Sequence, residues 1–88
     1  MKNFFVTGSA GFIGFHLCKL LLDQNFSVFG YDGLTDYYDV KLKHNRNSIL
    51  EKYPNFQSKI GMLEDYENLL AAIEAFRPDA VVHLAAQA

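Results

Sequence analysis

Short apolar runs alternate along this chain with longer segments in which apolar residues recur every three or four positions. The runs cover about residues 3–7, 27–31, 57–60 and 80–84. Their length is typical of strands, whereas the periodic segments between them have the spacing of helices that bury one face. The pattern therefore predicts four strands separated by three helices.

Each predicted helix carries an apolar face that is expected to pack on a sheet. In the first helix, about residues 11–24, this face consists of Ile13, Leu17, Leu20 and Leu21. The second helix presents Leu42, Ile49, Leu50 and Tyr53. The third helix presents Tyr66, Leu69, Leu70, Ile73 and Phe76. We expect Asn25 to close the first helix, Pro54 to stop the second and Asp65 to cap the start of the third.

The connections between the strands predict the sheet. Strands joined through helices run parallel, and such crossovers are right-handed in about 98% of cases. The strand that leads into a glycine turn is central in sheets of this kind, so the expected order is 3-2-1-4. The predicted fold class is α/β, a three-layer Rossmann-type parallel sheet with helices on both faces, truncated after the fourth strand.

The fourth strand, at about residues 80–84, is almost continuously apolar. Such a strand is expected to be covered on both faces, as in the interior of a parallel sheet. A full domain would continue with further strands beyond it, so one edge of this strand would be unpaired. We therefore expect the chain to associate with itself through that edge.

A glycine-rich segment, Thr7–Gly14, follows the first strand and opens the first helix. Glycine is needed where a backbone turns with unusual dihedral angles and approaches a pyrophosphate closely. The free amides at the start of the helix supply donors and the positive end of a dipole. Asp32 comes 18 residues after Gly14, close to the roughly 20-residue offset of an acid that binds the adenosine ribose. Together these features predict a dinucleotide site.

A competing interpretation is that the glycines only permit tight packing and that Asp32 is a solvated turn residue. If Asp32 does bind the ribose, its charge repels the additional phosphate of NADP. The three residues that follow it, Gly33, Leu34 and Thr35, include no Arg or Lys to offset that charge. NAD is therefore the expected cofactor.

Composition restricts the remaining classes of function. The chain has 88 residues, of which 50% are hydrophobic, so one small domain with a packed core is expected rather than disorder. The net charge of −2 gives no basic surface for nucleic acid. Neither a secretion leader nor a membrane-spanning run is apparent, which favours a cytoplasmic protein. Cys18 is the only cysteine, so it is expected to be a buried apolar residue outside any internal disulfide.

Three segments of the chain resemble the extended short-chain dehydrogenase/reductase family, specifically its NAD-dependent nucleotide-sugar epimerases and dehydratases. They are Thr7–Gly14, Asp32 after the second strand, and His83–Ala88. Within that family, Asp36–Lys43 and the closing His83–Ala88 are similar to UDP-glucuronate 4-epimerases. The resemblance implies that residues 1–88 are the N-terminal part of an NAD-binding Rossmann domain, without the catalytic and substrate-binding parts.

The same resemblance assigns the cofactor-binding residues. Those implied at the pyrophosphate are Gly8, Gly11, Phe12, Ile13 and Gly14. Those implied at the adenosine are Asp32, Gly33, Met62 and Leu63. Those implied at the nicotinamide half are Leu84, Ala85 and Ala86. Met62 and Gly33 depart from the acid and the Asn that are usual at their positions, which predicts a weakened affinity for NAD.

No catalytic residue and no metal ligand is assigned within the chain. The resemblance implies that the family's catalytic Tyr and the Lys four positions later lie beyond residue 88. Tyr37 and Lys41 share that spacing, but Tyr37 belongs to the adenosine end, which hydride chemistry does not reach. The three histidines have no second ligand at metal spacing. His83, within the fourth strand, is expected to be buried, neutral and hydrogen-bonded.

The implied function is the NAD-binding portion of an isomerase that inverts C4 of a UDP-sugar through transient hydride transfer to NAD. The 88-residue chain is expected to be inactive by itself, and the full-length protein is expected to be a homo-oligomer that binds a UDP-sugar. Two alternatives stay open. One is a standalone nucleotide-binding or NAD-sensing module, and the other is a fragment of a nucleotide-sugar dehydratase or reductase.

Overall fold

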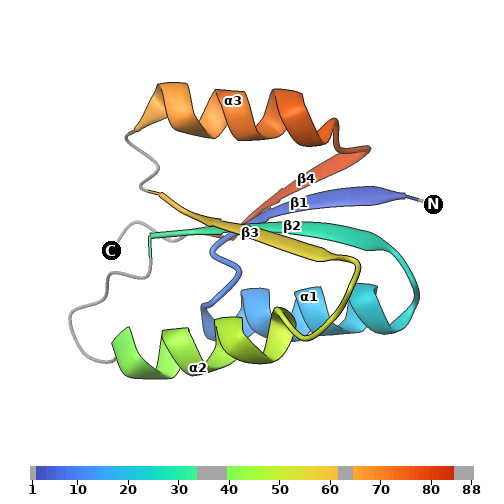
Figure 1. Cartoon of the computed structure of the whole chain (residues 1–88), viewed down its shortest axis with the longest axis vertical. Coiled ribbons are helices and arrows are strands. Elements are labelled where there is room, and N and C mark those ends of the chain that lie inside the picture. Colours follow the sequence, from blue (N-terminus) through green and yellow to red (C-terminus); the bar gives the residue numbers. More distant parts are fainter. Residues whose placement is uncertain (1, 34–39, 62–64, 85–88) are drawn as a thin grey trace.

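Strands and helices alternate through the computed structural model, which describes residues 2–33, 40–61 and 65–84. The elements are β1 (Asn3–Thr7), α1 (Phe12–Asp23), β2 (Ser27–Asp32), α2 (Val40–Leu50), β3 (Phe56–Ile60), α3 (Tyr66–Phe76) and β4 (Ala80–His83). This order confirms the one that the apolar pattern predicts (Figure 1). Asn25 has the left-handed φ of 68° that allows the chain to leave α1, as expected of a residue that closes a helix.

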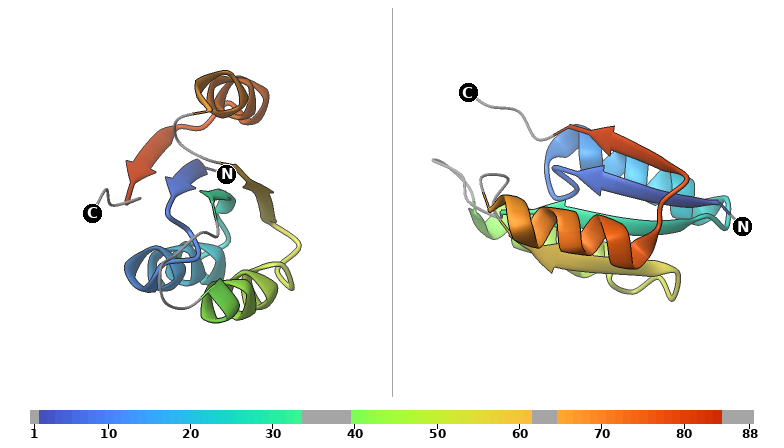
Figure 2. Two further views of the ribbon diagram at one scale, coloured as in Figure 1. Left: turned by 90° about the vertical axis from the view of Figure 1, so that its left-hand side faces the viewer. Right: turned by 90° about the horizontal axis from the view of Figure 1, so that it is seen from above.

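The strands form one parallel sheet in the order β3-β2-β1-β4, which confirms the predicted topology. Helices α1 and α2 cover one face and α3 covers the other, so the domain has three layers (Figure 2). The core on the α1/α2 side includes Val6, Val28 and Leu50, and the core on the α3 side includes Phe5 and Tyr31. None of the helices among the described residues is long and apolar enough to cross a membrane.

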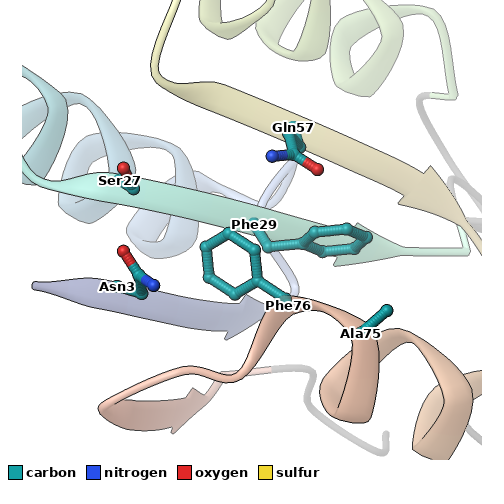
Figure 3. A pocket seen from close by; sticks show the side chains of 6 residues that line it. All are labelled: Asn3, Ser27, Phe29, Gln57, Ala75 and Phe76. Carbon is teal, nitrogen blue, oxygen red and sulfur yellow. The ribbon is translucent and has the colours of Figure 1, made fainter.

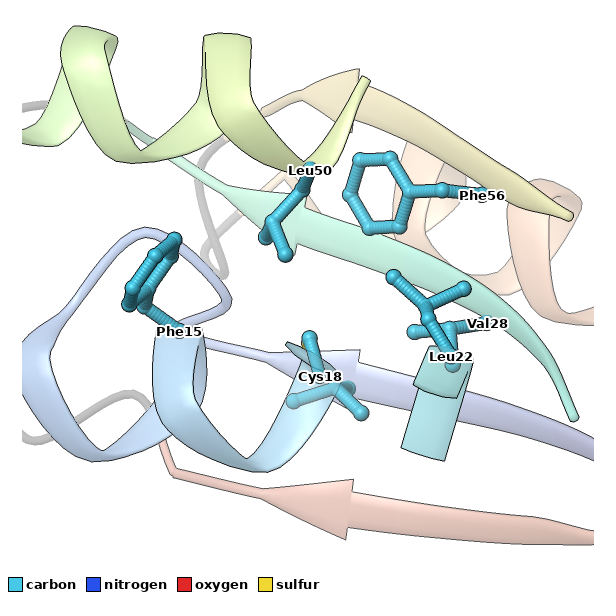
Figure 4. Close-up of a cluster of buried hydrophobic side chains, with 7 residues drawn as sticks. Phe15, Cys18, Leu22, Val28, Leu50 and Phe56 are labelled. Atoms are coloured by element: carbon cyan, nitrogen blue, oxygen red, sulfur yellow. The ribbon is translucent and has the colours of Figure 1, made fainter. Parts of the chain in front are cut away.

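Cys18 lies in the core between α1 and the sheet, close to Leu22 and Val28 (Figure 4). It is fully buried, as the sequence predicts. Burial raises the pKa of its thiol to about 12, because the charged thiolate would lose its hydration. Cys18 therefore serves as a small apolar side chain.

The face of α1 that packs on the sheet differs from the predicted one. Ile13 is 68% exposed and Leu20 is 56% exposed, whereas Phe15, Cys18 and Leu22 are buried. The reason lies at Gly14, which presses against the backbone of the glycine loop. This contact sets the rotation of the helix, so the residues four and eight positions after Gly14 face inward. The predicted stripe is therefore only partly right, because Leu21 packs against the core while Ile13 and Leu20 face outward.

The other two helices also bury fewer apolar residues than predicted. In α2, Leu50 is fully buried, but Leu42 and Ile49 are exposed. The helix ends at Leu50, before Pro54, and the Tyr53 amide closes a turn on the Leu50 carbonyl oxygen at 3.0 Å. Pro54 therefore follows a turn and does not itself stop the helix.

In α3, the predicted residues Tyr66 and Leu70 are exposed, whereas Ile73 and Phe76 pack on the sheet. Asp65 stands at the N-cap position, but its carboxylate caps no backbone amide. Among the described helices, only α3 packs on this face of the sheet, through Leu69, Ala72, Ile73 and Phe76.

Strand β4 is less covered than expected. Val81 is 51% exposed and His83 is also exposed. Helix α3 packs over Phe5 and Tyr31, on β1 and β2, and none of the described helices packs on the same face of β4. The prediction that His83 is buried is wrong. Its ring is nevertheless hydrogen-bonded, since Nδ1 lies 2.8 Å from Thr7 Oγ1.

Candidate functional site

The loop between β1 and α1 is a tight backbone turn in which two glycines have different roles. Gly8 has a φ of 75°, in the left-handed region that favours glycine. Its amide donates to the Tyr31 carbonyl oxygen at 2.9 Å, and its own carbonyl oxygen accepts from the Gly11 amide at 3.0 Å. At Gly14 the requirement is space, because a Cβ there would lie 2.0 Å from the Gly8 carbonyl oxygen.

Helix α1 begins at this loop with its first turn open. Gly11 is the N-cap residue, no side chain caps the helix, and the first turn contains no acid. The first amides of a helix have no partner within the helix. The amides of Phe12, Ile13 and Gly14 therefore lie at the N-terminus of the helix, which is the positive end of its dipole. This arrangement can bind a phosphate group.

Asp32 lies at the end of β2 and faces this loop. Its side chain is only 7% exposed, and Oδ2 accepts a hydrogen bond from the Ala10 amide at 3.0 Å. The competing interpretation of Asp32 as a solvated turn residue is therefore wrong. Gly33 follows directly and is partly buried.

Two cations of α2 reach the same place. The Lys43 ammonium donates to Asp32 Oδ1 at 3.5 Å, with 18% of the lysine side chain exposed. The Arg46 guanidinium donates to the Ala10 carbonyl oxygen at 3.3 Å and lies 5.8 Å from the centre of the Phe12 ring. Asp32 and Arg46 thus hold the amide and the carbonyl group of Ala10. The three residues after Asp32 include no cation, as the sequence shows, but Lys43 on α2 offsets part of the charge of Asp32.

Sequence reasoning missed Lys43 and Arg46 because it considered only the three residues after Asp32. The available signal was their spacing, since residues three apart in a helix share one face. The spacing does not say where α2 lies in the fold. Its position brings that face of the helix to the end of β2.

Ser9 lies behind the loop and is buried against Gly30 and Phe56. A Cβ on Gly30 would lie 2.6 Å from Ser9 Oγ and 2.8 Å from the Phe56 ring. In the part of the chain that the structure describes, Ser9 Oγ is buried and has no hydrogen-bond partner. The loop is therefore closely packed from behind, with one unsatisfied hydroxyl group.

The carboxyl end of β4 lies beside that of β1. The Leu84 amide donates to the carbonyl oxygen and to Oγ1 of Thr7, both at 3.1 Å. Because the glycine loop follows Thr7, Leu84 and the loop share one edge of the sheet, which is where ligands bind in folds of this kind. Leu84 is partly buried against the core on the α1/α2 side.

Several predicted positions lie outside the described residues. These are Met62, Leu63, Ala85 and Ala86, together with Tyr37 of the decoy pair. Their assignments stay predictions. Among the residues that are described, no three His, Cys, Asp or Glu side chains lie close enough together to hold a metal ion.

A cavity of about 310 Å³ lies elsewhere, between the sheet and the end of α3. Its lining consists of Asn3, Ser27, Phe29, Gln57, Ala75 and Phe76 (Figure 3). Asn3 and Ser27 begin β1 and β2, so this cavity is at the amino ends of the strands, opposite the glycine loop. No predicted cofactor residue lines it.

Comparison with known proteins supplies the remaining findings. A family model described as GDP-mannose 4,6 dehydratase matches residues 5–88. A probable UDP-glucuronate 4-epimerase of Rhizobium meliloti is 48% identical over 86 residues, which are 98% of this chain and 25% of that protein.

Two solved structures show the same fold. UDP-glucuronic acid 4-epimerase from Bacillus cereus, in complex with UDP-glucuronic acid and NAD, has a TM-score of 0.84 and 34% identity, covering 96% of this chain and 26% of that one. dTDP-glucose 4,6-dehydratase from Bacillus anthracis, in complex with NAD, has a TM-score of 0.84 and 28% identity, covering 99% and 27%. The chain thus spans about a quarter of the length of these proteins.

Proposed function

The chain belongs to the GDP-mannose 4,6 dehydratase family, and we propose that it is the NAD-binding part of an epimerase that acts on a UDP-sugar. The observation that carries this proposal is the meeting of an uncapped helix start and a buried carboxylate at one edge of the sheet. The helix start suits a pyrophosphate, and the carboxylate suits the hydroxyl groups of a ribose. The NAD complexes of the two structural relatives support it.

In this proposal the amides of Phe12, Ile13 and Gly14 bind the pyrophosphate. Gly8 and Gly11 keep the loop compact and leave its outer side open to the ligand. The close contact between Gly14 and Gly8 fixes the direction of these amides before any ligand arrives, which lowers the entropic cost of binding.

Asp32 accepts hydrogen bonds from the adenosine ribose in this proposal, with Gly33 beside it. Two further groups of residues complete the assignment from the family resemblance. Met62 and Leu63 contact the adenine. Leu84, Ala85 and Ala86 line the nicotinamide half.

The reaction proposed for the whole protein is inversion at C4 of the sugar of a nucleotide sugar. Bound by the residues named above, NAD would supply reversible hydride acceptance for this inversion, without net consumption of the cofactor. The present chain binds and orients this cofactor as the N-terminal part of the domain, in the cytoplasm. The catalytic Tyr and Lys belong to a region outside residues 1–88, so the chain alone turns nothing over.

A dehydratase is the second candidate, since one structural relative is a dTDP-glucose 4,6-dehydratase. The epimerase is favoured because the relative with 48% identity is a probable UDP-glucuronate 4-epimerase, whereas the dehydratase is 28% identical. A standalone NAD-sensing module would use the same cofactor residues without a catalytic half.

Titration calorimetry with NAD tests the proposed binding directly. We expect saturable heat below millimolar NAD with a chain shown to be folded by circular dichroism. Asp32→Ala is expected to weaken binding about tenfold or more, because it removes a charged acceptor. A folded wild-type chain that gives no heat at millimolar NAD would contradict the proposal.

Turnover is tested separately, by incubating the chain with NAD and UDP-glucuronate. We expect no epimerised sugar, and its appearance would show that the catalytic groups lie within residues 1–88. To separate the epimerase from a dehydratase, the full-length protein is also incubated with UDP-glucose, whose C6 hydroxyl group can leave as water. Only a dehydratase would release a 4-keto-6-deoxy sugar from it.

We also propose that two copies of the chain associate through β4. Val81 is 51% exposed and, in the described part of the chain, β4 is paired on one edge only, with β1. Ile13 and Leu20 are also exposed, on α1. Helix α1 and β4 border the same side of the domain (Figure 2).

A second copy suits this surface because two identical edges pair antiparallel around a twofold axis. Sedimentation at tens of micromolar is expected to show a dimer, and a clean monomer would contradict this association.

A further inference from the structure

The cavity between the sheet and the end of α3 is lined by residues that the proposed cofactor site does not use. It lies at the amino ends of the strands, and its polar side chains come from β1, β2 and β3, where they are those of Asn3, Ser27 and Gln57. Its volume of about 310 Å³ is at the lower end of the range for small-molecule sites. The cavity therefore suits a ligand of about one ring.

The apolar part of the lining includes two phenylalanine rings. The ring centres of Phe29 and Phe76 are 5.3 Å apart, and the ring planes are tilted by 57° (Figure 3). Phe29 also stacks on Phe5, with ring centres 5.1 Å apart, which holds it in place. Rings at this tilt do not form a parallel-walled slot in which a flat base would stack on both sides. They present a wedge-shaped apolar surface, which suits the C–H face of a puckered ring.

The polar part of the lining is uncharged. Among the described residues that line the cavity, none is an acid or a base. A phosphate, carboxylate or ammonium group would enter without an opposite charge beside it, and burying an unpaired charge is costly. The side-chain amides of Asn3 and Gln57 have both donors and acceptors of hydrogen bonds, as does the Ser27 hydroxyl group. The neutral hydroxyl groups of a ligand have the same double capacity, so the two sets match.

We propose that this cavity is a binding site for a neutral sugar ring. The C–H face of the ring packs on Phe29 and Phe76, and its hydroxyl groups bond to the amides of Asn3 and Gln57. Gln57 and Ala75 are exposed, so the sugar enters from solvent without any opening of the fold. Binding here does not depend on NAD, because the glycine loop lies at the opposite ends of the strands.

The experiment is an NMR titration of the ¹⁵N-labelled chain with the methyl glycosides of glucose, galactose and mannose. We expect at least one of them to shift the amide signals of Gln57, Ala75 and Phe76, with a dissociation constant of about 1–10 mM, as is typical of so small a ligand. The signals of the glycine loop are expected to stay in place. If none of the three glycosides gives saturable shifts around the cavity, the inference is wrong.

Two alanines of α3 supply a blocking variant and its matched control. Ala75→Leu is expected to weaken binding about tenfold or more, because the larger side chain occupies the cavity. Ala71 is exposed one turn earlier on the same helix and is not among the described lining residues. Ala71→Leu is expected to keep the dissociation constant within about twofold. Circular dichroism checks that both variants are folded, and equal affinities in the two would contradict the proposed site.

The hydrogen bonds are tested by Gln57→Ala. Gln57 is exposed at the rim of the cavity, so its truncation is expected to leave the fold intact. It is expected to weaken the glycoside about threefold to tenfold, because one hydrogen-bonding side chain is lost. Unchanged affinity would show that the polar lining does not select the ligand, and the assignment of a sugar would then be wrong.

Competition tests the class of ligand. Glucose 6-phosphate, glucuronate and uracil carry a phosphate, a carboxylate and a flat base, and each is expected to bind at least about fivefold more weakly than the best glycoside. Equal or tighter binding of any of them contradicts the proposal. Titration of the same labelled chain with NAD separates the two sites. If NAD binds and no glycoside does, this inference fails and the proposed function stands, whereas the reverse result leaves only the sugar site.

Discussion

The glycine loop and strand β4 adjoin the same central strand, β1, yet they are packed in opposite ways. At the loop, a Cβ on Gly14 would lie 2.0 Å from the Gly8 carbonyl oxygen, and both backbone groups of Ala10 have side-chain partners. At β4, Val81 is half exposed, and α3 packs elsewhere. The difference shows that the loop is complete as it stands, whereas β4 presents a surface suited to another strand.

The completeness of the loop predicts the largest effect. Gly14→Ala is expected to cost about 3 kcal/mol or more, because backbone must move to admit the methyl group and overpacking is expensive. For a small domain this is a large part of the free energy of unfolding. Urea denaturation followed by circular dichroism measures the change.

Gly11→Ala is the matched control for this substitution. A Cβ at Gly11 would lie 3.3 Å from the same Gly8 oxygen, and the residue has a negative φ. Its cost is expected to stay below about 1 kcal/mol. Equal losses in the two variants would contradict the idea that close approach at Gly14 defines the loop.

The sequence was sufficient to predict the order of the elements and of the strands, because apolar periodicity and the handedness of crossovers act locally. It did not predict the rotation of α1. Ile13 and Leu20 have the spacing of a buried stripe, but the contact of Gly14 with the loop turns them outward. A steric constraint on a residue without a side chain is invisible to an apolar pattern.

The sequence predicted some residues of the candidate site and missed others, and the reason again lies in packing. Asp32 and the glycines could be found because they stand at fixed offsets within one strand–helix–strand unit. Lys43 and Arg46 reach that unit from the next helix, and their approach depends on how α2 lies across the end of β2. Contacts between units require the packing, which no spacing rule provides.

The hydroxyl groups of Ser9 and Thr7 test the comparison between the loop and β4 through effects of intermediate size. Ser9→Ala is expected to stabilise the chain by about 1 kcal/mol, because Ser9 Oγ is buried without a partner among the described residues, and such groups are costly. Thr7→Val removes a hydroxyl group that pairs with His83 and the Leu84 amide. It is expected to cost about 1 kcal/mol. Thermal denaturation of the two variants should give midpoint shifts of opposite sign.

A loss of stability in Ser9→Ala would mean that its hydroxyl group has a partner after all. The loop would then contain a second polar contact, and Ser9 would belong with the groups that hold it. An unchanged midpoint in Thr7→Val would instead weaken the link between β1 and the end of β4.

The smallest effect on stability is expected at β4. Val81 is half exposed, so Val81→Lys is expected to change the free energy of unfolding by no more than about 0.5 kcal/mol. A lysine on an edge strand nevertheless opposes pairing with another chain, because its charge would have to be desolvated. Sedimentation of this variant should therefore show a monomer where the wild type forms a dimer, with matching urea curves at low concentration.

If Val81→Lys unfolds the chain, β4 is part of the completed core and the contrast with the loop disappears. If the variant stays folded and dimeric, the contact between copies lies on another surface.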